Sequence, residues 1–339
     1  MNIPAVTAFA GGRGVIMADS GTKLSMTKCK LSVLFQCISS SAGIVIASHC
    51  DFICSGIAMR GSSSCSSFDV TDSTFNLMTE SSLGISSSHG QKSNLSGCKF
   101  VNGMCGIMID SDAICNVTKS TFSGCKFSCR CRDSLLQLSR CEMYDCQKCL
   151  HSFGPKGNIQ AKDCRFEKIA LNCVECASES RIALERCVVE NSATCVVKTT
   201  SNSSLLIMNC SFVNCNTKVV VATGSSNIKM VGCSFTSMSG NGFDFSDNVT
   251  VFMENIVFHI CSGIGIQLSA SKLHMVSSKL SSILSHCVLC KKNSFLHATD
   301  CIFEFCNGKR VGIEQDSEIV IEADPSSGDQ NIVLVNCEI

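Results

Sequence analysis

The sequence is poor in several kinds of residue, and each shortage excludes a class of protein. Its 339 residues include no tryptophan, one tyrosine and three prolines, and charged residues make up only 17% of the chain. The formal net charge is +0, so the chain lacks the basic excess of a nucleic-acid-binding protein. No apolar run approaches the roughly 18 residues of a membrane-spanning helix, and residues 1–12 lack the basic and apolar regions of a signal peptide. We therefore expect no nucleic-acid partner, no membrane span and no secretion signal.

What the sequence does contain is a repeat. Two apolar residues stand two positions apart, Cys or Ser follows three positions later, and Phe or another apolar residue comes two positions after that. The Cys or Ser position, here called the anchor, is held by Cys29, Cys50, Ser73, Cys98, Ser120, Cys141, Cys164, Cys187, Cys210, Cys233, Ile256, Ser278, Cys301 and Cys337. Successive anchors are 21 to 25 residues apart, except for a last gap of 36. A period of about 23 residues predicts a solenoid.

The apolar residues of each repeat fall at every second position, which is the period of a β-strand. The segments between them are rich in Ser, Asn, Gly and Thr, which favour turns, and a second apolar site follows each anchor, as at Ile107 and Val196. Three short strands per repeat fit one coil of a parallel β-helix. A leucine-rich repeat has a similar period, but it needs another consensus and a return arm that this sequence lacks. We predict an all-β solenoid, a parallel β-helix of about 13–14 coils.

The pattern resembles the right-handed parallel β-helix repeat family, the pectate-lyase-like superfold, over roughly residues 20–339. The resemblance implies a right-handed, single-stranded β-helix, in which the family's Asn side chains at one turn stack as a ladder. In this chain Cys and Ser side chains take the place of Asn in the ladder, with cysteine at five consecutive anchors from Cys141 to Cys233. The resemblance is weak evidence for activity, because the same fold carries many functions.

Cysteine is unusually common, with 28 residues. Disulfides are one interpretation, because neighbouring coils lie close enough to be bridged. The other is that the cysteines, which recur in phase with the repeat, serve as small apolar core residues. Disulfide scaffolds are mostly small domains that lack a core, whereas this chain can bury a long one. We expect reduced thiols in a cytoplasmic protein, with a disulfide-containing secreted protein as the alternative.

We expect one domain, with residues 1–20 as an N-terminal lead-in and residues 21–339 as the β-helix. Residues 307–331 lengthen the last coil and predict an acidic loop insertion on the surface. Their acidic residues are Asp316, Glu318, Glu322, Asp324 and Asp329. Neither end shows an amphipathic helix that would cover a terminal coil. We therefore expect a protein partner, or self-association, through uncapped end coils or a flank.

Four cysteines have the spacing of a zinc site. Cys146 and Cys149 form one Cys-x2-Cys pair, and Cys173 and Cys176 form a second pair one repeat later. Thiolates at this spacing are typical zinc ligands. However, the distance between the pairs is one coil, so the repeat produces the pattern by itself. Core thiols are the simpler interpretation, and we expect no cofactor.

The best candidate for catalysis is a group of acids and arginines on adjacent coils. Its members are Asp110, Asp112, Arg130, Arg132 and Asp133. Polysaccharide cleavage, the precedent in the resembled family, uses carboxylates or a base at defined separation. The family's galacturonase-type motifs are absent here, and the scarcity of Trp and Tyr predicts that the aromatic platforms of sugar grooves are missing. Surface ion pairing is therefore the alternative that we favour.

These observations predict a non-enzymatic scaffold or protein-interaction rod with a cysteine-lined core. A protein of this kind is similar to the binding-type members of the β-helix family. The alternative is a secreted or surface carbohydrate-active protein, either a polysaccharide lyase or hydrolase or an adhesin. The two predictions differ in what they expect of the acidic residues and of the cysteines.

Overall fold

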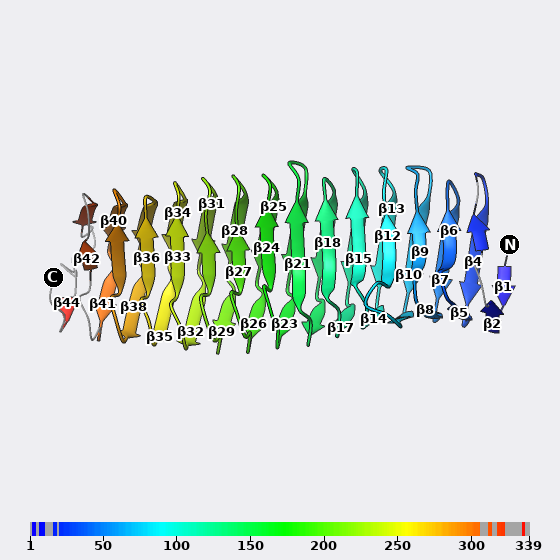
Figure 1. Cartoon of the computed structure of the whole chain (residues 1–339), viewed down its shortest axis with the longest axis horizontal. Coiled ribbons are helices and arrows are strands. Elements are labelled where there is room, and N and C mark those ends of the chain that lie inside the picture. Colours follow the sequence, from blue (N-terminus) through cyan, green and yellow to red (C-terminus); the bar gives the residue numbers. More distant parts are fainter. Residues whose placement is uncertain are drawn as a thin grey trace. The chain divides into compact units, whose positions relative to one another are not determined.

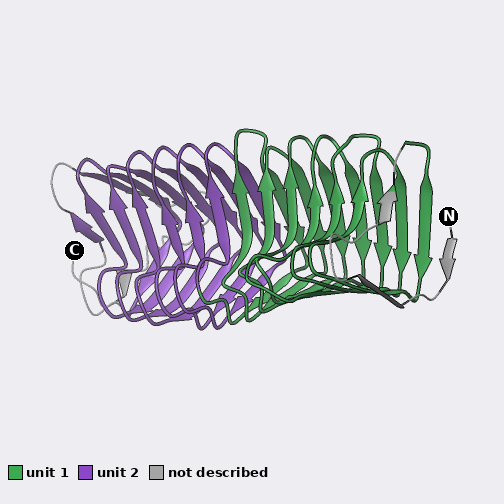
Figure 2. Cartoon of the chain, turned by 45° about the vertical axis from the view of Figure 1, so that its right-hand side comes forward, with its two compact units in different colours: residues 1–170 green, residues 171–339 purple. Residues whose placement is uncertain are grey.

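The computed structural model describes residues 2–4, 7–10, 16–18, 20–305, 311–313, 317–322 and 334–335. These residues form strands, turns and bends, with no helix among them. The fold is the predicted all-β parallel solenoid, with about 13 turns and a period of about 23 residues. The chain divides into two compact units, residues 1–170 and residues 171–339, which Figure 2 colours separately. Each coil contributes one strand to each of three sheets, here called A, B and C (Figure 1).

Unit 1 contains the first strands of all three sheets. Its sheet A consists of β1 (Asn2–Pro4), β4 (Lys23–Thr27), β7 (Ile44–Ser48), β10 (Ser67–Thr71), β13 (Lys92–Ser96), β16 (Ile114–Thr118), β19 (Leu135–Ser139) and β22 (Asn158–Lys162). Its sheet B consists of β2 (Thr7–Ala10), β5 (Lys30–Val33), β8 (Asp51–Cys54), β11 (Thr74–Leu77), β14 (Lys99–Val101), β17 (Thr121–Ser123), β20 (Glu142–Tyr144) and β23 (Arg165–Glu167). Its sheet C consists of β3 (Ile16–Ala18), β6 (Gln36–Ser40), β9 (Ile57–Gly61), β12 (Leu83–Ser87), β15 (Cys105–Asp110), β18 (Phe127–Arg132) and β21 (Lys148–Phe153).

Unit 2 repeats the same arrangement. Its sheet A consists of β25 (Arg181–Glu185), β28 (Ser204–Met208), β31 (Asn227–Val231), β34 (Thr250–Glu254), β37 (Lys272–Val276), β40 (Phe295–Thr299) and β43 (Glu318–Glu322). Its sheet B consists of β26 (Val188–Glu190), β29 (Ser211–Val213), β32 (Ser234–Met238), β35 (Val257–Cys261), β38 (Lys279–Ile283), β41 (Ile302–Glu304) and β44 (Leu334–Val335). Its sheet C consists of β24 (Val174–Ala177), β27 (Val197–Thr199), β30 (Val220–Ala222), β33 (Phe243–Ser246), β36 (Ile266–Ser269), β39 (Val288–Lys291) and β42 (Val311–Ile313).

The structure corrects the expectation of a lead-in at residues 1–20. Strands β1, β2 and β3 pair in parallel with the strands of the next coil, so these residues form a coil of their own. Ile3 pairs with Met26, and Ala8 pairs with Leu31. The sequence pattern misses this coil because it has no Cys or Ser at the anchor position.

The structure describes two strands within residues 307–331, where the sequence suggests a loop insertion. These are β42 and β43, and Leu296 pairs with Ile319 at the regular step of one coil. Strand β43 carries Glu318 and Glu322, whereas the other predicted acidic residues, Asp316, Asp324 and Asp329, lie outside the described residues.

The core lies between the three sheets and is filled by the repeat's apolar slots. Phe52, Phe75, Phe100 and Phe122 occupy equivalent positions on successive coils of unit 1 and are fully buried. Their ring centroids are 4.7 to 4.8 Å apart and their planes are nearly parallel. This distance equals the usual separation of paired strands, so the backbone register itself stacks the rings. Each buried Phe contributes roughly 1.5–3 kcal/mol to the free energy of unfolding.

The turn from sheet A to sheet B has one conformation at every anchor that the structure describes. The residue before each described anchor has a positive φ, namely Lys28, His49, Asp72, Gly97, Lys119, Arg140, Asp163, Arg186, Asn209, Gly232, Asn255, Ser277 and Asp300. A single left-handed residue costs about 1 kcal/mol when it is not Gly. A hydrogen bond from the anchor side chain is well placed to offset that cost.

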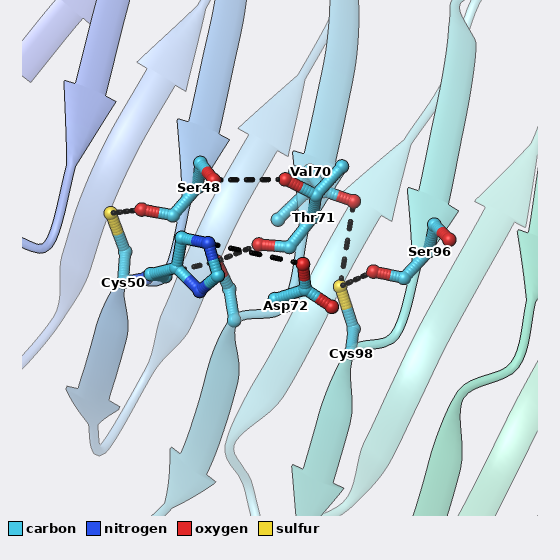
Figure 3. A network of polar contacts seen from close by, with 9 residues as sticks. Ser48, Cys50, Val70, Thr71, Asp72, Ser96 and Cys98 are labelled. Carbon is cyan, nitrogen blue, oxygen red and sulfur yellow. Dashed lines mark hydrogen bonds and ion pairs between the residues drawn. The ribbon is translucent and has the colours of Figure 1, made fainter.

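Figure 3 shows how the anchors make this bond. The Cys50 thiol donates to the Ser48 carbonyl oxygen at 3.3 Å, and the Cys98 thiol donates to the carbonyl oxygens of Ser96 and Val70 at 3.6 Å. Where the anchor is Ser73, its hydroxyl oxygen also accepts the Cys50 backbone N–H at 3.0 Å. The predicted ladder of thiols and hydroxyls is thus confirmed, and the anchor favours Cys or Ser because it needs a small hydrogen-bonding side chain.

Candidate functional site

The predicted group of acids and arginines lies on the outward face of sheet C in unit 1 and on the turns that lead from it to sheet A. Asp110 pairs in register with Arg132 on the next coil. The Arg132 Nε donates to Asp110 Oδ1 at 2.8 Å, its Nη2 donates to Oδ2, and the Ser111 hydroxyl donates to Oδ1 at 3.1 Å. Desolvation alone would raise the pKa of Asp110, but the bonds from Arg132 and Ser111 hold that pKa below its usual value. Asp110 is therefore a charged hydrogen-bond acceptor at neutral pH.

Asp112 and Asp133 occupy equivalent turn positions on adjacent coils. Both have a positive φ, and the Asp112 backbone N–H donates to the Asp133 carbonyl oxygen at 2.8 Å. The Asp112 carboxylate forms an ion pair with Lys156 Nζ at 2.9 Å. The Asp133 carboxylate accepts the backbone N–H of the same Lys156 at 3.1 Å. These two carboxylates fasten successive turns to each other.

Each predicted carboxylate is thus held by a donor from another coil, one coil away for Asp110 and Asp133 and two coils away for Asp112. Asp110 is directed to Arg132, whereas Asp112 and Asp133 are directed to Lys156. General acid–base cleavage needs two carboxylates that share a substrate position. This arrangement instead fits the ion pairing that the sequence favoured as the alternative.

Arg130 belongs to a different group, which we call the cation–aromatic cluster and define as Phe127, Arg130, Lys148, His151 and Phe153. All five side chains are half-buried on the outward face of β18 and β21. The Arg130 guanidinium carbon lies 4.8 Å from the Phe127 ring centroid and 5.4 Å from that of Phe153. The His151 ring lies 5.9 Å from Phe127 and 5.0 Å from Phe153. An arginine held flat against aromatic rings keeps the edge of its guanidinium group for hydrogen bonding.

The two phenylalanines of this cluster depart from the repeat pattern. Most phenylalanines do fill the buried slot after the anchor, as Phe122 does. Phe127 and Phe153 stand outside that slot, at the first and last positions of sheet C strands. Their displacement from the repeat pattern was visible in the sequence and is the signal that would have identified them.

A second group missed by sequence reasoning lies on the outward face of sheet A in unit 1. Asn94 donates from its side-chain amide to Asp69 Oδ1 at 2.8 Å, and Asn116 donates to Asn94 Oδ1 at 3.0 Å. Gln137 donates to Gln160 Oε1 at 3.0 Å. The five residues pair in register on five successive strands. We call them the amide ladder, a polar strip that runs across the coils.

A groove of about 570 Å³ lies at the corner between sheets B and C of unit 1. Glu80 and Lys126 line it, and Gly103 and Gly124 form part of its surface. Gly103 has φ +79° and Gly124 has φ +64°, a conformation that favours glycine. The groove contains none of the predicted catalytic residues.

The four cysteines with zinc-site spacing are all fully buried. Cys146 and Cys149 lie in unit 1, where the Ser128 hydroxyl donates to Cys146 Sγ at 3.2 Å. Cys173 and Cys176 lie in unit 2, where Cys176 donates to the Ser180 carbonyl oxygen at 3.3 Å. Within the described part of the chain, no three His, Cys, Asp or Glu side chains are grouped so as to hold a metal ion. These cysteines have the surroundings of core thiols.

Most of the other described cysteines are buried thiols as well. Of the 28 cysteines, 25 carry thiols, Cys287 is disulfide-bonded, and Cys306 and Cys337 lie outside the described residues. Cys65 is the one thiol among the 25 that is classed as exposed. Burial raises the pKa of Cys98 to about 11 and that of Cys105 to about 12. Cys98 and Cys105 are therefore protonated at neutral pH and are poor nucleophiles and poor metal ligands. By contrast, the hydrogen bond with Cys125 lowers the pKa of the buried Cys146 thiol to about 7.

Comparison with protein families identifies the fold. Residues 55–212 and 195–339 match the model described as the right-handed β-helix region. The chain belongs to this family. The match confirms the predicted resemblance and extends over most of the sequence. No curated protein matches the chain.

Several solved structures are similar to the chain at very low sequence identity and low TM-score. The catalytic domain of a GH87 α-1,3-glucanase in complex with nigerose is 6% identical, with a TM-score of 0.33; the match covers 94% of this chain and 63% of that domain. The tailspike protein of E. coli bacteriophage HK620, in complex with a hexasaccharide, is 10% identical (TM-score 0.36, 92% and 73% covered). The Streptococcus pneumoniae surface protein and adhesin PfbA is 11% identical (TM-score 0.36, 93% and 91% covered). These likenesses concern the fold alone.

Within the described residues, no helix has the length and hydrophobicity required to cross a membrane.

Proposed function

We propose that this protein is a non-enzymatic scaffold that binds protein partners on the outward faces of its sheets. The observation that carries the proposal is that each predicted catalytic carboxylate is already held by a hydrogen-bond donor on another coil. A cation–aromatic cluster beside them supplies side chains that are enriched in protein interfaces, namely Arg and Phe. Protein binding can therefore use the outward Arg and Phe side chains as they stand. Catalysis by the carboxylates would first require their ion pairs to be broken.

The proposal places the protein in the cytoplasm. Among the 25 described thiols, those at the anchors recur once per coil, and they donate hydrogen bonds to backbone carbonyl oxygens, as Cys50 and Cys98 do. Thiols used in this way stay reduced most readily in the cytosol.

Parallel binding and activity measurements test this function. The immobilised chain is probed with a peptide array and with a glycan array, and neutral and uronic polysaccharides are assayed for release of reducing ends. We expect peptide binding, no glycan binding and no cleavage. Cleavage that disappears in Asp110→Ala, Asp112→Ala or Asp133→Ala would overturn the proposal in favour of a hydrolase or lyase.

The amide ladder favours a second candidate, a carbohydrate-binding surface protein of the adhesin type. Side-chain amides and carboxylates are well suited to hydrogen-bond the hydroxyl groups of a sugar. Asp69, Asn94 and Asn116 already bond to one another, so a sugar would have to compete with these bonds. Glycan-array binding that is lost in Asn94→Ala would favour this candidate.

Self-association is a variant of the first proposal, in which the partner is a second copy docked on a flank or at an end coil. Light scattering coupled to size exclusion distinguishes it. A mass that rises with protein concentration supports a second copy, whereas a constant monomer mass leaves a different protein as the partner.

A further inference from the structure

The outward face of sheet C in unit 1 carries an uneven distribution of charge. Its outward residues on β9, β12, β15, β18 and β21 include one carboxylate, Asp110, which Arg132 already binds. On the same face stand Arg60, Arg130 and Lys148. The face is therefore basic, although the chain as a whole has a net charge of +0.

Arg130, on β18, has an unused hydrogen-bonding group. Its Nε is buried and has no hydrogen-bond partner. No ion pair with Arg130 is found among the described residues. A buried donor without an acceptor is unfavourable, and a guanidinium fork matches a carboxylate in two parallel hydrogen bonds. The group that would satisfy Arg130 is thus a carboxylate brought by a partner.

The strand register fixes a second point of contact. Arg60, Ser86, Met108 and Arg130 pair in register, so they form one column across four coils. Three strand spacings put Arg60 and Arg130 about 14 Å apart. In an extended peptide, side chains four residues apart are also about 14 Å apart, at about 3.4 Å per residue. Between the two arginines the column presents Ser86 and Met108, a small side chain and an apolar one.

We propose that this column is the docking site for an extended acidic peptide segment of a partner protein. Two carboxylates of the segment, four residues apart, bind Arg130 and Arg60, and an apolar residue midway between them packs on Met108. Phe127 and Phe153, whose ring centroids lie 4.8 and 5.4 Å from the Arg130 guanidinium carbon, contact the peptide beside it. This assignment rests on the proposed function, because it names the surface and the chemistry by which the scaffold binds protein.

The test uses a fluorescent nine-residue peptide with capped ends, measured by anisotropy against the full chain. Glutamates occupy its third and seventh positions, leucine its fifth, and Val or Thr most others so that it remains extended. One control peptide has glutamines in place of both glutamates, and another has the glutamates adjacent. We expect the first peptide to bind about tenfold more tightly than either control, because each charge-assisted bond is lost separately.

Variants of the chain locate the site. Arg130→Lys keeps the charge but loses the planar fork, and we expect about tenfold weaker binding. Arg60→Gln should also weaken binding, and it should abolish the preference for glutamates four residues apart. Arg140→Gln, an exposed arginine on the turn between sheets A and B, removes the same charge elsewhere and should leave the affinity unchanged. Circular dichroism and thermal unfolding establish that each variant is folded.

Three outcomes would overturn the inference. Equal weakening by Arg140→Gln would mean that binding follows net charge and not this column. No difference among the three peptides would show that spacing and charge are not recognised, and the array results would still decide the proposed function. Tighter binding of an oligo-uronate or of single-stranded DNA, lost in Arg130→Lys, would assign the column to another polymer and would also count against the protein-binding function.

Discussion

Unit 1 and unit 2 have the same strand order, yet they differ on both sides of their sheets. On the outward face of sheet A, unit 1 carries the amide ladder, whereas unit 2 carries Phe252, His274 and His297 in one register column. In the core, the phenylalanines of unit 1 stack face to face. In unit 2, Phe243 from sheet C meets Phe235 edge-on at 4.9 Å, and the regular stack ends there.

The difference shows which part of the repeat is constrained. Inward side chains must fill a closed space. Their packing can therefore differ only when a residue of a neighbouring sheet also differs, as at Phe243 of sheet C. Outward positions meet solvent and are constrained only by their neighbours on adjacent strands. Function is therefore expected on the outward faces, and the two units are free to present different surfaces.

The largest loss of stability is expected from removing one buried phenylalanine from the core of each unit. Phe100→Ala in unit 1 and Phe235→Ala in unit 2 should each lower the free energy of unfolding by about 3–5 kcal/mol, because both rings are fully buried. Phe100→Leu, the control, keeps most of the apolar volume and should cost markedly less. Urea denaturation followed by circular dichroism measures the change. A loss below about 1 kcal/mol at Phe100 would contradict the stacked core of unit 1.

A smaller change in stability, in this case a gain, is expected at a repeat position that occurs in both units, directly before a sheet A strand. In unit 1 the slot holds Gln91, which is fully buried and whose amide has no hydrogen-bond partner among the described residues. In unit 2 it holds Ser226, whose hydroxyl donates to the Thr223 carbonyl oxygen at 2.8 Å. Gln91→Met should therefore stabilise the protein by about 1–2 kcal/mol, and Ser226→Ala should destabilise it by about 1 kcal/mol. Thermal unfolding of both variants measures these changes. Destabilisation by Gln91→Met would contradict the conclusion that the Gln91 amide lacks a hydrogen-bond partner.

Removing the ion pair on sheet C should have a modest effect. Asp110→Asn should cost at most about 1 kcal/mol, because Arg132 is half-exposed and solvent screens the pair. The folded state lowers the pKa of Asp110, so this contribution is present above the unfolded pKa and is lost as the pH falls through the lower folded value. Unfolding at neutral pH and at pH 3 should show the variant and the wild type converging in acid. A difference that persists in acid would point to packing rather than charge.

The smallest effect is expected at the histidines of unit 2. Desolvation, together with the charges of His297 and Lys272, lowers the pKa of His274. The folded state therefore binds a proton less readily than the unfolded state, and stability declines as the pH falls from the unfolded pKa towards the folded one. His274→Gln should flatten this part of the pH profile of thermal unfolding. The amide ladder of unit 1 does not titrate in this range, so Asn94→Ala should leave the slope unchanged.

The sequence predicted the features that repeat and missed those that do not. The period, the three strands per coil and the anchor ladder all follow from residues that recur, so they could be read from one chain. The first coil escaped because residues 1–20 lack an anchor with Cys or Ser. The pattern also could not show that Ile319 continues the regular step of one coil, because that strand has no anchor close behind it.

The candidate site was only partly predictable, because the pattern fixes which coil a residue occupies but not its contacts. It brought Asp110 and Arg132 to adjacent coils, and the structure joins them. It also grouped Arg130 with the acids, whereas the register places Arg130 against His151 and between two phenylalanines. That contact depends on which sheet face each residue meets, which requires the register of sheet C.

The account's central claim is that the interior, including its cysteines, is structural and that function lies on the outward faces. Alkylation of the native, unreduced protein, read by mass spectrometry before and after denaturation, tests this claim most directly. We predict that Cys65 is modified rapidly, and that the buried thiols become reactive only after unfolding. Rapid modification of Cys125 or Cys146 in the native protein, or widespread pairing among the 25 described thiols, would contradict the claim and assign the core cysteines a chemical function.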